Sequence, residues 1–91
     1  MTTLHMDVEL SRNVVSQMRK TCDNLHTEVA SLSNCMQSFV GSSWISPAAS
    51  EFSNDISEWS QVLRIKINEL EALSERLERE IAEWEATAQQ M

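Results

Sequence analysis

Few side chains in this chain of 91 residues could carry out chemistry, and they do not gather into a site. His5 and His26 lie 21 residues apart, so they do not form a paired metal-ligand motif. A chain with one glycine cannot build a glycine-rich phosphate loop. The many glutamates are dispersed around a helix instead of lining a cleft, where carboxylate pKa values are usually perturbed. We therefore predict a protein that is not an enzyme, with no catalytic residues, no metal site and no cofactor.

The two cysteines are separated too far to pair within one helix. Cys22 and Cys35 are 13 residues apart, which on a helix is a rise of roughly 20 Å. A disulfide requires Cα atoms within about 7 Å. We predict that Cys22 is a small core residue and that Cys35 lies at the edge of the apolar stripe, and a bridge between two chains stays open.

The elements that must position any functional residue are two long helices. The only glycine, Gly41, and the only proline, Pro47, lie in one stretch near the middle of the chain. Because all strong breakers of regular structure are in this one place, we predict a helical hairpin. The helices should cover about residues 7–40 and 47–86, with a turn over 41–46. Ser46 followed by Pro47 predicts the N-cap and the first residue of the second helix.

Apolar residues recur at helical spacing on both sides of this turn. In the first helix they have a period of 3.5 between Met18 and Phe39, which predicts left-handed wrapping around a partner helix. In the second helix they have a period near 3.6 between Phe52 and Trp84, which predicts a straighter helix. That second line consists of Phe52, Ile56, Trp59, Leu63, Ile67, Leu70, Leu73, Leu77, Ile81 and Trp84.

Two such helices expose more apolar surface than one hairpin can cover. We therefore predict an all-α fold in which a single antiparallel hairpin domain, residues 1–91, pairs into a four-helix-bundle dimer. The partner is a second copy or a sister hairpin. The residues predicted to make protein contacts are Leu25, Val29, Leu32, Trp44, Phe52, Trp59, Leu70 and Leu77.

The charge of the chain narrows the choice of partner. The formal net charge is −7, with ten acids against four bases in residues 41–91. An acidic chain is a poor ligand for nucleic acid or for an anionic membrane. No apolar run approaches the length of a membrane span, and the N-terminus lacks the features of a secretory signal. Composition alone therefore predicts a cytoplasmic protein without membrane insertion.

Trp44 is a large apolar ring in a turn, and periodicity does not explain it. One interpretation is that it covers the end of the core. The other is that it anchors a docking surface, because aromatic residues carry much of the energy of protein interfaces. The two interpretations are compatible, and both stay open.

Two long helices joined by a turn that contains a tryptophan resemble the WXG-motif family, the ESAT-like small proteins of type VII secretion. The matching segment is Trp44-Ile45-Ser46, followed by small residues and then by Phe52. The chain departs from the family pattern in two places. Ser46 stands where the motif has glycine, and the chain has no tyrosine for the C-terminal export signal of a tyrosine followed by an acid.

The resemblance implies an antiparallel hairpin that pairs with itself or with a sister protein. It also implies export without a cleaved signal peptide through an ATPase-driven machine, whose ATPase is a further expected partner. The chain would act as a secreted effector, an export partner or an adaptor. The alternative is a cytoplasmic coiled-coil adaptor or a secretion chaperone outside the type VII system.

Overall fold

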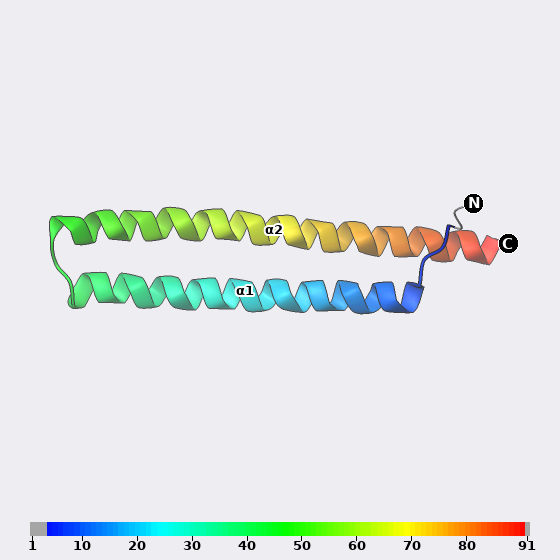
Figure 1. Cartoon of the computed structure of the whole chain (residues 1–91), viewed down its shortest axis with the longest axis horizontal. Helices are drawn as coiled ribbons and strands as arrows, with labels where there is room; N and C mark the ends of the chain where they lie inside the picture. The colour runs from blue at the N-terminus through cyan, green and yellow to red at the C-terminus, as the bar shows by residue number, and fades with distance from the viewer. Residues whose placement is uncertain (1–3, 91) are drawn as a thin grey trace.

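The computed structural model describes residues 4–90, and two antiparallel helices make up nearly all of this range. Helix α1 covers Val8–Ser42 and helix α2 covers Pro47–Gln90. Together they form a rod of 68 × 20 × 20 Å. The start of α1 and the end of α2 lie at the same end of the rod, and the turn lies at the other (Figure 1). The prediction of an all-α helical hairpin is confirmed.

Helix α1 begins with a side-chain cap and ends two residues later than expected. The carboxylate of Asp7 accepts a hydrogen bond from the backbone N–H of Leu10 at 3.0 Å, which satisfies one of the free donors of the first turn. At the other end the carbonyl of Phe39 accepts from the N–H of Ser43 at 2.9 Å and of Trp44 at 3.1 Å. Gly41 therefore lies inside the helix, without a positive φ, and the turn itself is residues 43–46.

Helix α2 begins where the sequence predicts. The hydroxyl oxygen of Ser46 accepts a hydrogen bond from the N–H of Ala49 at 3.1 Å, so Ser46 is the N-cap and Pro47 the first helical residue. The helix continues past the expected end near residue 86 to Gln90. No glycine or proline follows Pro47, and alanine, glutamate and glutamine are good helix formers.

The face that α2 turns toward α1 has a period of 3.5, and the predicted period near 3.6 is wrong. The prediction took apolar residues from two faces of the helix and left out serines that lie on one of them. The residues on this face alternate in steps of four and three and are Ala49, Ser53, Ile56, Ser60, Leu63, Ile67, Leu70, Ser74, Leu77, Ile81 and Trp84, and Glu71 and Glu85 are half-buried beside them. Small side chains at several of these positions let the two helices approach closely.

The predicted stripe of α1 also divides between two directions. Val15, Cys22 and Val29 are buried against α2. Cys22 and Val29 form the central core cluster with Ile67, and Leu63 and Leu70 pack against it. Met18 and Met36 of the stripe are half-buried, whereas Leu25, Leu32 and Phe39 are 37–50% exposed.

Two buried serines of α2 differ in one respect that matters for stability. Ser74 donates a hydrogen bond from its hydroxyl to the carbonyl of Glu71 at 2.7 Å. The hydroxyl oxygen of Ser60 is buried and has no hydrogen-bond partner among the described residues. A buried polar group without a partner keeps its desolvation penalty.

Ser60→Ala should therefore raise the free energy of unfolding by about 1 kcal/mol, because it removes an unpaired hydroxyl and improves helix propensity. Ser74→Ala is the matched control, since it gains the same propensity but loses a hydrogen bond. We expect it to be close to neutral. Urea denaturation of both variants measures the difference, and equal effects would contradict the assignment of Ser60 as unpaired.

Candidate functional site

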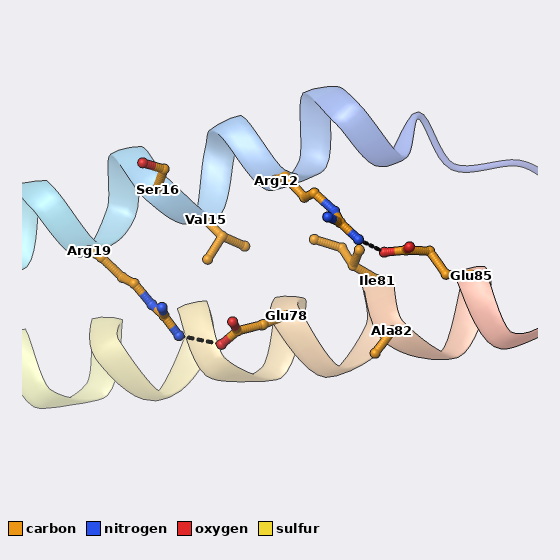
Figure 2. Close-up of a pocket in the computed structure, with 8 residues that line it drawn as sticks. All are labelled: Arg12, Val15, Ser16, Arg19, Glu78, Ile81, Ala82 and Glu85. Atoms are coloured by element: carbon orange, nitrogen blue, oxygen red, sulfur yellow. Dashed lines mark hydrogen bonds and ion pairs between the residues drawn. The ribbon is translucent and has the colours of Figure 1, made fainter.

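The hairpin has two unlike faces, and the first is polar. On this face three pairs of polar side chains join α1 to α2: Arg12–Glu85, Arg19–Glu78 and His26–Glu71. From one pair to the next, the residue number rises by seven on α1 and falls by seven on α2. The first two pairs are drawn in Figure 2. Exposed ion pairs contribute little stability each. Their common spacing nevertheless favours one alignment of the two helices.

A hollow of about 510 Å³ lies between the Arg12–Glu85 and Arg19–Glu78 pairs (Figure 2). Val15 and Ile81 point into the space between the helices there. The two arginines and two glutamates around the hollow neutralise each other, so it offers no excess charge to an ionic ligand. Its lining contains no histidine or cysteine that could act as a general base or nucleophile.

The described residues contain no cluster of side chains suited to bind a metal ion. No group of three or more His, Cys, Asp or Glu side chains within residues 4–90 could hold a metal ion. His5 is exposed, and His26 faces Glu71 with Nε2 and Oε1 3.0 Å apart. No helix in the same range is long and apolar enough to cross a membrane.

The second face of the hairpin is apolar. On α1 Leu25, Leu32 and Phe39 follow one another by seven residues, and on α2 Phe52 and Trp59 do the same. Such residues lie along one side of their helix. Leu32, Phe52 and Trp59 line one shared hollow of about 270 Å³ together with Met36, which places the two sets on the same side of the hairpin.

We call this surface the apolar face. It consists of partly exposed large side chains at this seven-residue spacing, namely Leu25, Leu32 and Phe39 on α1 and Phe52, Trp59 and Leu73 on α2.

The apolar face holds four of the residues predicted to make protein contacts: Leu25, Leu32, Phe52 and Trp59. The other predicted aliphatic residues lie elsewhere. Val29 is buried between the helices, and Leu70 packs against the core cluster. Leu77 is half-buried on the interhelical side of α2.

Sequence reasoning did not separate the apolar face from the core, and it missed Leu10, Val14, Phe39 and Leu73 as surface residues. The sequence does contain a signal that separates the two sets of residues on α1. A seven-residue spacing runs through Leu25, Leu32 and Phe39, parallel to that of Val15, Cys22 and Val29.

The turn carries a compact aromatic cluster. The ring of Trp44 lies between those of Phe39 and Phe52, with ring centroids 6.2 and 5.6 Å away. Tilted aromatic pairs at these distances are mutually stabilising. Trp44 is half-buried, whereas the neighbouring Ile45 is 84% exposed. Of the motif residues, Trp44 thus packs within the turn, Ser46 caps α2 and Ile45 projects into solvent.

The charges around the turn are unevenly placed, which sequence reasoning also missed. No charged residue occurs between Glu28 and Glu51, a stretch that includes the turn and the adjoining part of α1. On α2 the first charged residues are Glu51, Asp55 and Glu58, spaced by four and three so that they share one side of the helix. Among the described residues none of these three acids has an ion-pair partner.

The two cysteines are free and lie in opposite surroundings. The thiol of Cys22 is buried at 1% exposure, and its burial raises its pKa, to which the nearby charges of Glu71 and Asp23 add. A thiol that is buried and protonated reacts slowly. Cys35 is exposed on α1. The prediction of a core role for Cys22 is confirmed.

A thiol-reactive dye should therefore label one cysteine rapidly in the native protein and both after denaturation in urea. Mass spectrometry of the native adduct should place the label on Cys35. The Cys35→Ser variant is the control, because it should show almost no rapid labelling. Equal labelling of both thiols in the native protein would mean that α1 and α2 separate readily at Cys22.

Comparison with known proteins gives no matching family model, no matching curated protein and no matching solved structure. Function is therefore inferred from the two faces of the hairpin and from its turn.

Proposed function

We propose that this chain is a non-enzymatic WXG-type protein that works by binding other proteins, first of all a second hairpin. Two hairpins joined through their apolar faces would form a four-helix-bundle dimer. The dimer would serve type VII secretion as a secreted effector, an export partner or an adaptor, and would leave the cell without a cleaved signal peptide.

The apolar face is the observation that carries this proposal. Its six large side chains, from Leu25 to Leu73, are each between 37% and 54% exposed. Exposed apolar patches of several large side chains mark sites of protein–protein interaction. The opposite face is occupied by polar pairs between the helices, so the hairpin has one side suited to association.

The link to secretion is supported by the turn. A hairpin with Trp44-Ile45-Ser46 at its corner and an aromatic residue, Phe52, shortly after it resembles the WXG family in architecture and in motif position. Ser46 replaces the glycine of the motif without strain, because it acts as a helix cap and no residue in the described turn has a positive φ. A partner hairpin that carries the tyrosine-based signal would direct export of the pair.

Two measurements test this function. Light scattering of the purified protein at micromolar concentration should give twice the mass of the 10.4 kDa chain, and a folded monomer would contradict the association. In cells of the producing organism, the protein should appear in the culture medium and disappear from it when the secretion ATPase gene is deleted. A dimer that stays inside the cell would instead favour a cytoplasmic adaptor or secretion chaperone.

A further inference from the structure

We propose that the hollow in the apolar face receives Lys66 of a second copy of this chain, so that the apolar face is complementary to itself in an antiparallel dimer. To the proposed function, on which it rests, this adds the identity of the partner, its orientation and the residue that selects it.

Lys66 is the one charged residue in the line that α2 contributes to the apolar face. This line has a seven-residue spacing and reads Phe52, Trp59, Lys66 and Leu73. The side chain of Lys66 is 67% exposed, and its ammonium group lies 3.4 Å from the carboxylate of Glu69, one turn toward the C-terminus. A contact of this length between exposed groups is weak, so the ammonium group is free to meet a partner.

The hollow in the same face has the composition that suits a lysine side chain. It has a volume of about 270 Å³, and its lining is apolar except for the carboxylate of Asp55. Asp55 has no ion-pair partner in the described part of the chain. A lysine has a long apolar stem and a charged tip. Its stem would lie against the rings of Phe52 and Trp59 in this hollow, and its ammonium group would pair with Asp55.

The order of residues on α2 indicates that this lysine comes from a second copy. The line has its midpoint between Trp59 and Lys66, and an antiparallel copy of α2 centred there would place Lys66 opposite Trp59 and Leu73 opposite Phe52. Each pair would occur twice, as a two-fold contact requires. Because the ammonium group is directed toward the C-terminal end of its helix, it would reach the level of Asp55 on the partner. The ring of Trp59 would also attract the cation.

Helix α1 has its centre at the same level of the rod. Its line is centred on Leu32, with an apolar residue seven positions away in each direction. The contacts His26–Glu71 and Gln37–Ser53 lie on either side of Leu32. Interpolation between them places Leu32 level with about residue 61 of α2, within about one turn of the midpoint of the α2 line. One two-fold axis therefore serves both helices, which favours a second copy over a different protein.

Disulfide trapping tests the orientation, in chains that also carry Cys35→Ser because Cys35 is exposed. Leu32→Cys should oxidise to a linked dimer, since the two-fold axis brings this position close to its own copy. Leu25→Cys and Phe39→Cys should each give little linked dimer alone, and a mixture of the two should link efficiently. In a parallel dimer α1 would instead face α2 of the partner, and Leu32→Cys would not link to itself.

An exchange of charges tests the role of Lys66. Lys66→Asp should weaken the dimer about tenfold or more in sedimentation equilibrium, because two carboxylates would then share the hollow. Adding Asp55→Lys should restore most of the affinity, since the lysine and the aspartate have only changed places. Lys66→Met, which keeps a long apolar stem, should cost less than Lys66→Asp. The matched control is Arg64→Asp, which makes the same change of charge on the side of α2 away from the apolar face and should change the affinity much less.

All of these substitutions are at exposed positions, so the variants should keep the helix content of the wild type in circular dichroism. The proposal is overturned if Lys66→Asp and Arg64→Asp weaken the dimer alike, if the exchange of charges does not restore the affinity, or if Leu32→Cys does not link to itself. A monomeric wild type would contradict the proposed association as a whole. A dimer that fails these tests would contradict only the pairing through Lys66, so the two failures can be told apart.

Discussion

Ile67→Ala should lower the free energy of unfolding by about 2–4 kcal/mol, as expected when a large buried side chain is truncated. Ile67 is 5% exposed and is the contribution of α2 to the central core cluster, where it meets Cys22 and Val29. A two-helix structure has few other buried residues that could compensate for the loss. Urea denaturation followed by circular dichroism measures the loss as a lower midpoint.

The matched control is Ile65→Ala, two residues away on the same helix. Ile65 is 58% exposed, so the same substitution there should change stability by no more than about 0.5 kcal/mol. The comparison holds helix propensity constant, because both changes replace isoleucine with alanine in α2. If the two variants lost equal stability, α1 and α2 would not pair along Ile67.

The second large effect concerns association. The double variant Leu32→Glu/Trp59→Glu should weaken the dimer by on the order of a thousandfold and leave a folded monomer at micromolar concentration. Both side chains line the same hollow of the apolar face. In a dimer the new carboxylates would be removed from water, which is costly. Sedimentation equilibrium measures the change in mass.

A control for charge alone is Ser38→Glu/Gln61→Glu. These exposed positions are on the same two helices but away from the apolar face, and the variant has the same net charge as the double variant above. It should remain dimeric with a helix content like that of the wild type. If both double variants were monomers, general repulsion between acidic chains would explain the result, and the apolar face would not be the interface.

The positions of the helices could be read from the sequence because their determinants are local. Pro47 marks the start of α2, and Ser46 caps it through a contact three residues away, whereas Gly41 lies inside α1, which is why the start of the turn was predicted two residues too early. The division of apolar residues between core and surface is not local. Ser60 and Ser74 are polar by type yet buried, because α1 lies over them. Only the alignment of the two helices decides that these serines are inside while Trp59 is partly exposed.

The candidate site also depends on contacts between the two helices that the sequence alone does not show. The apolar spacing identified Leu32 and Trp59 as candidates, but it could not show that they share one hollow, since that contact joins residues far apart in the chain. Trp44 stood out in the sequence as an aromatic residue in a turn. Its place between Phe39 and Phe52 requires both helix ends, and so does the exposure of Ile45 beside it.

The shape of the hairpin also determines how it responds to mechanical force. Both ends of the described chain lie at one end of the rod, and the turn lies at the other (Figure 1). A motor that pulls on the C-terminal end while the N-terminal end is held would peel α2 from α1. Arg12–Glu85 would separate first, then Arg19–Glu78, then His26–Glu71, and the aromatic cluster around Trp44 last. Because the contacts break one after another instead of together, a small steady force is enough to open the molecule from this end.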